Sequence, residues 1–165
     1  MRETVKIFIE KCRKDAIIPS YANPDDAGMD IYAAEDTTIK PGATVIVPTG
    51  LKVAIPIGFE LQVRPRSGIS FRTKLRLSNS PGTIDSGYRD EVGVIMSNAS
   101  PTETSDNIKT LEKGNGGEGT YEIHKGDRIA QFVLARVPMI EFEQTDDVKN
   151  IGNNRGGGFG STGHK

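Results

Sequence analysis

The chain has 165 residues, enough for one domain with a single hydrophobic core. It carries 21 basic and 22 acidic residues, so no basic excess indicates polymeric nucleic acid as a partner, and only a local basic site is left open. The one cysteine, Cys12, cannot form an internal disulfide, which favours a reducing compartment. No apolar run approaches the roughly 20 residues that span a bilayer, so we expect a soluble, cytoplasmic protein without membrane contact.

Short apolar runs separated by glycine and proline follow one another along the chain. Residues 4–10 alternate, with Val5, Ile7 and Ile9 on one face, which is the period of a half-buried strand. Further runs of this kind cover residues 44–47, 51–55, 59–63, 75–77, 92–96, 129–137 and 139–142. Their length and spacing predict an all-β sandwich, jelly roll or barrel. The best helical candidate is short, about residues 68–75.

Two segments break this pattern. Residues 98–122 are polar and contain a cluster of glycines, so we expect an exposed insertion between two core strands, flexible at least in part. Glycine also supplies six of the twelve residues 152–163, which makes ordering of the tail costly in chain entropy. We therefore expect one β domain over residues 1–151 and a flexible arm over residues 152–165.

A glycine-rich tail with one aromatic side chain and one arginine has two interpretations. It is either a disordered terminus or a lid. In a lid, backbone N–H groups would wrap an anion, Arg155 would pair with it and Phe159 would stack on a flat group. Composition alone does not separate the two.

Four further segments hold residues that suit chemistry on a phosphate. Residues 64–70 place two arginines, a serine and a glycine at the start of the helical candidate. This suits phosphate binding, although a surface turn with paired arginines explains the residues equally well. A tight turn over residues 79–88 carries a carboxylate and a tyrosine three residues apart, yet most aspartates in such turns only cap backbone groups. Residues 26–30 and 126–131 carry further polar side chains, but alone they indicate a functional site only weakly.

Several common catalytic sites find no support in the sequence. It contains neither a G-x-x-x-x-G-K-[ST] phosphate loop nor a G-x-S-x-G nucleophile turn. The two histidines, His124 and His164, have no metal-ligand spacing to a partner, and a single cysteine cannot supply a structural zinc site. A carboxylate that acts on a phosphate, with a metal held mainly by the substrate, fits better.

Taken in order, these segments resemble the five motifs of the trimeric dUTP diphosphatase (dUTPase) family. The matching segments are residues 26–33, 65–70, 82–94, 126–131 and 155–163. The resemblance implies a jelly-roll-like β-clip or barrel, a short helical turn after the second motif and a flexible C-terminal arm. It also implies a homotrimer with shared active sites that hydrolyses dUTP to dUMP and pyrophosphate. This reaction limits uracil incorporation into DNA and supplies dUMP for thymidylate synthesis.

The resemblance assigns roles to the third motif and the residues before it. Asp85 takes the place of the aspartate that activates the water attacking the α-phosphate. Tyr88 matches a tyrosine that packs under the deoxyribose and leaves no room for a 2′-hydroxyl. Asn79 matches an asparagine that helps to read the uracil edge. The hairpin backbone supplies the other hydrogen bonds to the base, from Gly82, Thr83 and Ile84.

The other motifs imply the phosphate site, the metal site and the lid. Asp30 resembles an aspartate that helps to hold hydrated Mg²⁺, the cofactor that the family implies. Arg155 would reach the γ-phosphate, and Phe159 would stack over the uracil. The remaining expected contacts to the substrate come from Arg66, Ser67, Gly68, Gln131, Gly160 and Ser161.

The sequence departs from the family pattern in three places. Asp90 stands where the family usually has glycine, and aspartate is among the better substitutes if that position needs a positive φ. Arg155 lies four residues before Phe159 instead of five, and Asn154 holds the usual place of the arginine. The insertion at residues 98–122 has no counterpart in short members of the family.

Two alternatives stay open. A dCTP deaminase shares the fold and the trimer, but it should lack the glycine-rich fifth motif with its phenylalanine. The second alternative is a non-enzymatic role in which the insertion binds a protein partner. This role is also compatible with dUTPase activity in the same chain, because some phage-type relatives act as regulators.

Overall fold

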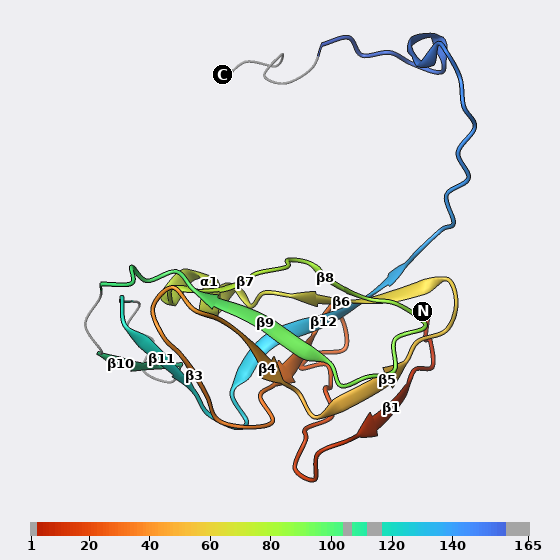
Figure 1. Cartoon of the computed structure of the whole chain (residues 1–165). Coiled ribbons are helices and arrows are strands. Elements are labelled where there is room, and N and C mark those ends of the chain that lie inside the picture. Colours follow the sequence, from red (N-terminus) through yellow and green to blue (C-terminus); the bar gives the residue numbers. More distant parts are fainter. Residues whose placement is uncertain (1–2, 104–106, 112–116, 158–165) are drawn as a thin grey trace.

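Figure 1 shows a computed structural model of the chain, which describes residues 3–103, 107–111 and 117–157. Within these ranges the body is built from short strands and a single short α-helix, so the expected all-β fold class is confirmed. No helix in the described ranges is long and apolar enough to cross a bilayer. The elements are β1 (Phe8–Lys11), β2 (Met29–Tyr32), β3 (Thr37–Ile39), β4 (Thr44–Pro48), β5 (Leu51–Ala54), β6 (Phe59–Arg64), α1 (Ser67–Arg72), β7 (Leu75–Leu77), β8 (Gly82–Ile84), β9 (Gly93–Asn98), β10 (Ile108–Thr110), β11 (Thr120–Ile123), β12 (Arg128–Arg136) and the 3₁₀ turn η1 (Val148–Asn150).

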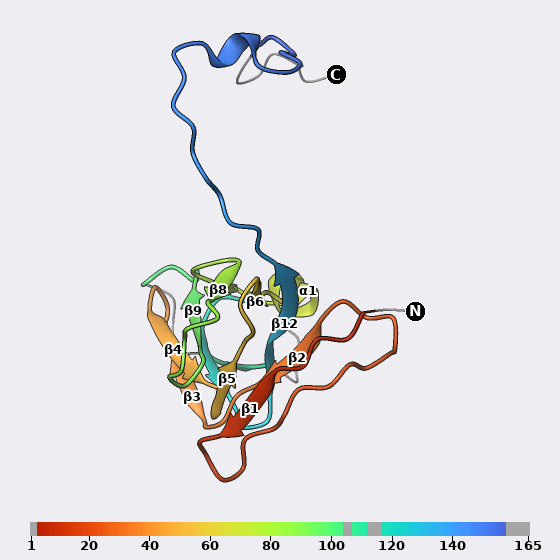
Figure 2. The same ribbon diagram turned by 90° about the vertical axis from the view of Figure 1, so that its right-hand side faces the viewer.

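The strands form four small sheets around one interior. Their orders are β1-β5, β10-β11-β3, β2-β12-β6-β8 and β4-β9-β7, and every pair is antiparallel except β10 with β11. Seen along the axis in Figure 2, the strands enclose this interior as in a barrel.

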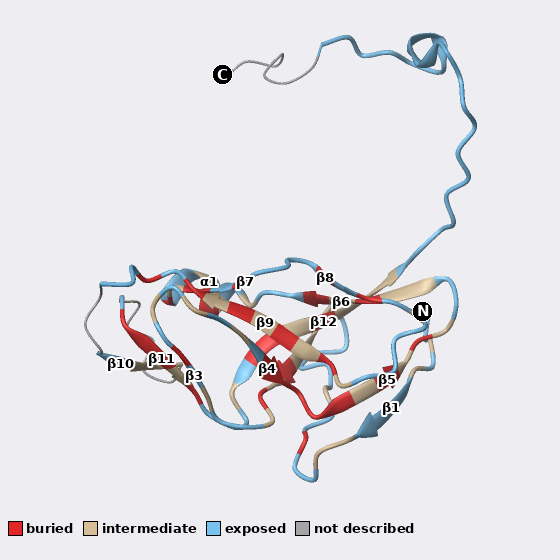
Figure 3. Ribbon diagram, in the orientation of Figure 1, coloured by how far each residue is buried: buried red, intermediate tan, exposed pale blue. Residues whose placement is uncertain are grey.

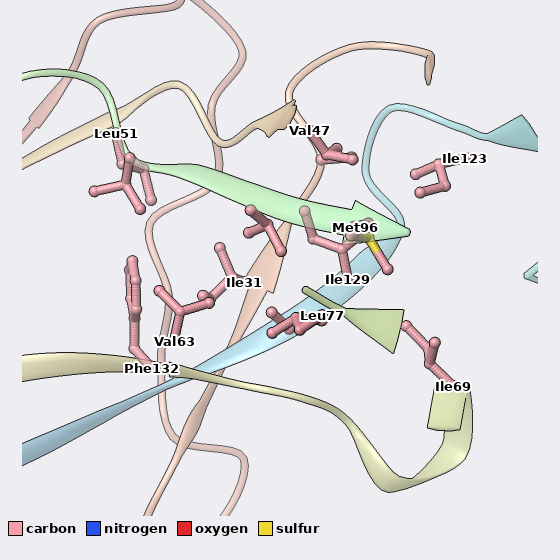
Figure 4. Close-up of a cluster of buried hydrophobic side chains, with 14 of the residues drawn as sticks. Ile31, Val47, Leu51, Val63, Ile69, Leu77, Met96, Ile123, Ile129 and Phe132 are labelled. Carbon is pink, nitrogen blue, oxygen red and sulfur yellow. The ribbon is translucent and has the colours of Figure 1, made fainter. Parts of the chain in front are cut away.

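Alternation along the strands fills the interior with apolar side chains. In β9, Val94 and Met96 are buried and the residues between them are half-buried. Figure 3 shows the same alternation on other strands, and Figure 4 shows Met96 in one cluster with Ile31 of β2 and Phe132 of β12. Full burial of each such side chain contributes about 1.5–3 kcal/mol, so this cluster is the main source of stability.

Most of the expected elements are confirmed. The runs at residues 44–47, 51–55, 59–63, 75–77, 92–96 and 129–137 become β4, β5, β6, β7, β9 and β12, with ends shifted by at most two residues. The helical candidate is α1, which ends at Arg72 because the backbone becomes extended at Thr73, whose Oγ1 donates to the Ile69 carbonyl (2.7 Å). Strands β2, β3, β8, β10 and β11 lie outside the expected runs and have only three or four residues each.

One expected strand is partly confirmed and another is wrong. Of residues 4–10, only those from Phe8 onward belong to a strand, β1, which pairs with β5 alone. The expected face is confirmed, because Val5 and Ile7 are half-buried and Ile9 (37% exposed) is less exposed than Phe8 (72%). Residues 139–142 form no strand, and Met139 and Phe142 are 97% and 91% exposed. No described strand completes a ladder beside them, and apolar alternation without such a neighbour does not hold a strand.

Residues 98–122 were expected to be an exposed insertion, and this expectation is wrong at both ends of the segment. Asn98 and Thr120 are buried, as are their neighbours Ser100 and Tyr121. The amide of Asn98 tolerates burial because Nδ2 donates to the carbonyls of Ile39 (2.9 Å) and Gly119 (2.7 Å), while Oδ1 accepts from the Ser100 N–H (3.0 Å). The segment therefore begins and ends inside the core.

Beyond β12 the chain leaves the body as an exposed arm, as Figures 1 and 2 show. Val137 N–H donates to the Gly58 carbonyl (2.9 Å), and every residue from there to 157 is exposed. The exposed segment thus starts near residue 137, well before the boundary expected at residue 152.

Replacement of Asn98 by alanine should lower the free energy of unfolding by about 2 kcal/mol, because two buried carbonyl groups lose their donor. Urea denaturation would measure the change. Asn153→Ala, at an exposed position of the arm, is the control and should have no effect. Equal stability of the two variants would contradict the role assigned to the buried amide.

Candidate active site

A row of paired residues crosses the four-stranded sheet and carries much of the predicted site. Asp30 of β2 pairs with Gln131 of β12, and Gln131 pairs on its other side with Arg64 of β6. The neighbouring residue of β6, Val63, pairs with Gly82 of β8. With about 4.8 Å between strands, the two ends of the row lie within about 15 Å of each other.

A cavity of about 140 Å³ lies at the β8 end of the row. Five of its lining residues belong to the predicted site: Asn79, Gly82, Thr83, Ile84 and Tyr88. The others, which the sequence did not indicate, are Val63, Val92, Gly93 and Ile95. The volume is well below the roughly 300–1,000 Å³ of pockets that enclose drug-sized ligands, so the cavity suits a single ring.

Gly82 brings the hairpin backbone close to this cavity. A Cβ atom at Gly82 would lie 3.3 Å from Val63 Cβ and 3.3 Å from Asn79 Nδ2, which is tighter than ordinary contact. A side chain here would require Val63 or Asn79 to shift by a few tenths of an ångström. Glycine therefore lets β8 lie close to β6 and to Asn79 without such a shift.

The turn after β8 holds Tyr88 by two hydrogen bonds. Its N–H donates to the Asp85 carbonyl (3.1 Å), and its hydroxyl donates to the Glu91 carbonyl (2.9 Å). Tyr88 is 38% exposed, so its ring forms a wall that is open on one side. Asp85 follows β8 directly and is exposed. Asp90 does not occupy a position that needs glycine, because no described residue other than glycine has a positive φ.

At the other end of the row, Asp30 gathers three side chains. Arg66 donates from Nε (2.8 Å) and Nη2 (3.3 Å) to its two carboxylate oxygens. Arg128 Nη1 donates to Asp30 Oδ2 (3.3 Å), and Gln131 Nε2 donates to Asp30 Oδ1 (3.4 Å). Two guanidinium groups face one carboxylate, so the cluster keeps an excess positive charge that suits phosphate oxygens.

Arg128 is a site residue that the sequence reasoning missed, although it lies in the segment 126–131. A β-bulge between Arg128 and Ala130 shifts the register of β12 against β2. Bulges of this kind redirect side chains. Simple alternation along the strand could not predict that Arg128 reaches Asp30.

Ser67 and Gly68 begin α1 directly after Arg66, which is the residue before the first turn. The Ser70 N–H donates to the Arg66 carbonyl (3.0 Å) and closes that turn. A Cβ atom at Gly68 would meet the Arg72 guanidinium at 2.8 Å, but that is the end of a flexible side chain. Packing within the chain therefore does not demand glycine at this position.

The described residues contain no group of three His, Cys, Asp or Glu side chains that could hold a metal ion. The Asp30 oxygens already accept hydrogen bonds from two arginines. These residues fit a metal whose ligands are mainly substrate oxygens and water, with Asp30 as an acceptor for a metal-bound water.

Glu91 lies at the far end of the turn after β8 and is held there by hydrogen bonds to its carboxylate. Arg13 Nε and Nη2 donate to its carboxylate at 2.7 and 3.1 Å, and the Gly50 N–H donates at 2.8 Å. Burial opposes ionisation of Glu91, but the hydrogen bonds from Arg13 and Gly50 and the charges of Arg13 and Lys52 outweigh it. Together they hold the pKa of Glu91 below its ordinary value.

The predicted lid falls largely outside the described residues, which end at 157 and do not include Phe159, Gly160 and Ser161. Arg155 is an exposed residue of the arm, and Figure 1 shows the arm leading away from the barrel. Within one chain, the structure forms two separate groups, the residues of the cavity and those around Asp30, and among the described residues Arg155 makes no hydrogen bond to either group.

A family model described as dUTPase matches residues 14–113 and 112–163. The chain belongs to the dUTPase family. Relatives named deoxyuridine 5'-triphosphate nucleotidohydrolase include one from Solibacter usitatus, 41% identical over 164 residues, which cover 96% of this chain and 97% of the relative. Another, from Gloeothece citriformis, is 39% identical over 160 residues, with 96% and 97% of the two chains covered.

Solved dUTPase structures share this fold. The dUTPase of Staphylococcus bacteriophage 80alpha with dUpNHpp has a TM-score of 0.85 at 27% identity, over 97% of this chain and 99% of the phage chain. A mutant dUTPase from phage phi11 of S. aureus, described with a coordinated structural Mg(II) ion, has a TM-score of 0.78 at 25% identity, over 88% and 99% of the two chains. The jelly-roll dUTPase fold expected from the five motifs is confirmed.

The lowered pKa of Glu91 predicts how stability depends on pH. A carboxyl group with a lowered pKa in the folded state stabilises the protein above its unfolded pKa, and this contribution is lost as the pH falls through the folded value. Wild-type protein should therefore lose free energy of unfolding below about pH 4.5, and Glu91→Gln should lose less over the same interval.

Chemical denaturation between neutral pH and about pH 3 would measure both slopes. Glu103→Gln, which changes an exposed glutamate, is the control and should follow the wild type. The assignment fails if Glu91→Gln also follows the wild type.

Proposed function

We propose that the chain hydrolyses dUTP to dUMP and pyrophosphate, with Asp85 activating the water that attacks the α-phosphate. Membership of the dUTPase family supports the reaction. The observations that carry the assignment of the site are a cavity for one ring at β8 and a cationic cluster around Asp30. Asp85 stands exposed in the turn that walls the cavity.

The uracil ring occupies the cavity at β8. Its polar edge meets the hairpin backbone and the Asn79 amide, which Gly82 allows to approach closely. This proximity leaves no room for the 5-methyl group of thymine. Cytosine has the wrong pattern of donors and acceptors, so each backbone group left unpaired would cost about 1–3 kcal/mol.

The deoxyribose packs against Tyr88. Two hydrogen bonds hold this residue, at its N–H and at its hydroxyl, so the ring does not turn away to make space. A ribose 2′-hydroxyl would collide with the ring. Selection of the sugar therefore works by steric exclusion, without a polar group that recognises deoxyribose.

The triphosphate extends toward Asp30 and its arginines. Arg66 and Arg128 supply fixed guanidinium groups, Gln131 supplies an amide, and Ser67 and Gly68 add the start of α1.

Asp85 acts as the general base. It accepts a proton from the attacking water, the bond from the α-phosphorus to the bridging oxygen breaks, and pyrophosphate leaves with the electron pair of that bond. General-base catalysis of this kind contributes about 10²–10⁴ to a rate. Mg²⁺ would neutralise charge on the phosphates, with Asp30 accepting a hydrogen bond from one of its waters.

We further propose a homotrimer in which the arm of one subunit crosses to another. The arm carries apolar side chains that its own barrel leaves uncovered, among them Met139 and Phe142. β1 pairs with β5 alone, and beside it lies an apolar cavity of about 220 Å³ lined by Ile7, Ile9, Ile18, Pro19, Met29, Val53, Leu61 and Phe132. A second copy of the chain thus offers both an open strand edge and an apolar surface for the arm.

The deaminase alternative is not favoured, because the family match extends through the fifth-motif segment to residue 163. The surface on which the insertion could bind a protein partner is smaller than the sequence indicated, because the buried ends of the insertion belong to the core. Such a role would rest on the exposed residues 99, 101–103, 107, 108 and 118, among the residues described.

Pyrophosphate release with each deoxynucleoside triphosphate and with UTP tests the proposal. Only dUTP should be turned over efficiently, chelation of Mg²⁺ should slow the reaction, and chromatography should show no deamination of dCTP. Asp85→Asn should lower kcat by about 10²–10⁴ with little change in dUTP affinity. Asp90→Asn, an exposed carboxylate of the same turn, is the control, and unchanged turnover by Asp85→Asn would remove Asp85 as the base.

Removal of the Tyr88 ring should admit ribose. Tyr88→Ala is expected to lower the ratio of kcat/KM for dUTP over UTP by about 10–100-fold. Phe71→Ala, which removes an exposed aromatic ring of α1, should leave this ratio unchanged. If the selectivity of Tyr88→Ala equals that of the wild type, steric exclusion does not choose the sugar.

Truncation before Gly152 should preserve the trimer and abolish most activity, because the lid is lost while the apolar part of the arm is kept. Light scattering and pyrophosphate release would measure the two effects. Co-assembly with full-length Asp85→Asn chains should restore part of the activity, since an intact arm can then close a site that has its base. A truncated enzyme with full activity would exclude the lid.

A further inference from the structure

The turn that carries Asp85 and Tyr88 is held at its far end by Glu91, to which the proposed function gives no role. The backbone carbonyl of Glu91 accepts the Tyr88 hydroxyl (2.9 Å), and its carboxylate accepts the Gly50 N–H (2.8 Å). The position of Glu91 therefore decides where the Tyr88 ring lies.

Arg13 fixes Glu91 from a distant part of the sequence. Its Nε and Nη2 donate to the two carboxylate oxygens at 2.7 and 3.1 Å, while Nη1 donates to Glu35 at 2.5 Å. The Arg13 guanidinium group is thus held by Glu91 on one side and by Glu35 on the other. The N–H of the preceding residue, Cys12, donates to the Gly50 carbonyl (2.9 Å) and fixes the backbone beside Arg13. Two parallel hydrogen bonds between a guanidinium group and a carboxylate fix the orientation of the carboxylate as well as its distance from the guanidinium group.

Other contacts hold the start of β9 without Arg13. Thr49 Oγ1 donates to the Val92 carbonyl (2.7 Å), and the Val92 N–H donates to the Leu51 carbonyl (2.8 Å). Thr49, Leu51 and Val92 are buried. Loss of the ion pair would leave these bonds in place and would release mainly Glu91 and the turn before it.

We propose that the Arg13–Glu91 ion pair is a positioning device for sugar selection, which rests on the proposed function. It holds the Glu91 carbonyl where the Tyr88 hydroxyl can reach it, and so keeps the Tyr88 ring against the sugar. Neither Arg13 nor Glu91 lines the base cavity; both line a separate cavity of about 240 Å³ on the side of β4. They are positioning residues that act through Tyr88.

The test compares kcat and KM for dUTP and for UTP in the wild type, Arg13→Lys and Arg13→Met. Arg13→Met should lower the ratio of kcat/KM for dUTP over UTP by about three- to tenfold, mainly by improving UTP as a substrate. Arg13→Lys keeps the charge but loses the planar fork, so it should fall between the other two. Arg13→Met/Glu91→Gln should shift the ratio no further than the larger single change, because both substitutions break one interaction.

Lys125→Met is the matched control. It breaks the ion pair between Lys125 Nζ and Asp15 (2.7 Å), which holds the same N-terminal turn without touching Glu91. Its selectivity should equal that of the wild type, whatever its Tm.

Unchanged selectivity in Arg13→Met, with a Tm lowered as in Lys125→Met, would overturn the inference and leave the proposed function intact. If Arg13→Met does not fold, Arg13→Lys and Glu91→Gln decide the question by the same ratio, and wild-type selectivity in both would overturn it. Failure of the wild type to turn over dUTP would instead overturn the proposed function.

Discussion

The register of β12 between β2 and β6 is the constraint on which the site depends. This register sets Gln131 beside Asp30 and Arg64, while the next residue, Phe132, is buried in the core. A slip by one residue would exchange these two faces, so that an amide would enter the core and an aromatic ring would leave it. Burial of the apolar face thus specifies the polar row on the opposite face.

The sheet and the turn divide the recognition of the nucleotide between them. The groups around Asp30 come from β12, which lies between β2 and β6, and from the residue before α1, and they suit a phosphate chain whose charge is the same in every nucleotide. The groups that we propose to distinguish base and sugar lie at β8 and in the turn after it, where one hydrogen bond holds the Tyr88 N–H and another holds its hydroxyl. In this proposal, selectivity depends on anchors of the turn such as Glu91.

Local patterns in the sequence predicted the strands with clear alternation, and the resemblance to the dUTPase motifs supplied five of the nine residues that line the cavity. They could not predict β2 or β8, because three or four residues do not show a period. The alternation in the sequence also does not reveal the β-bulge beside Ile129, so the sequence did not indicate that Arg128 reaches Asp30. Asn98 looked like the first residue of an exposed insertion, since only the folded chain shows the two carbonyls that satisfy its amide. Such errors arise where tertiary contacts override composition.

The uncovered arm has a consequence for the timing of catalysis. In the proposed trimer, a single chain would have its own cavity and carboxylate but no neighbour to close the site. Hydrolysis would then begin only when three copies meet, so that at low abundance the rate would rise more steeply than the amount of protein. Dilution would reverse the process, and the cell would control this enzyme through the number of copies it holds as well as through the concentration of its substrate.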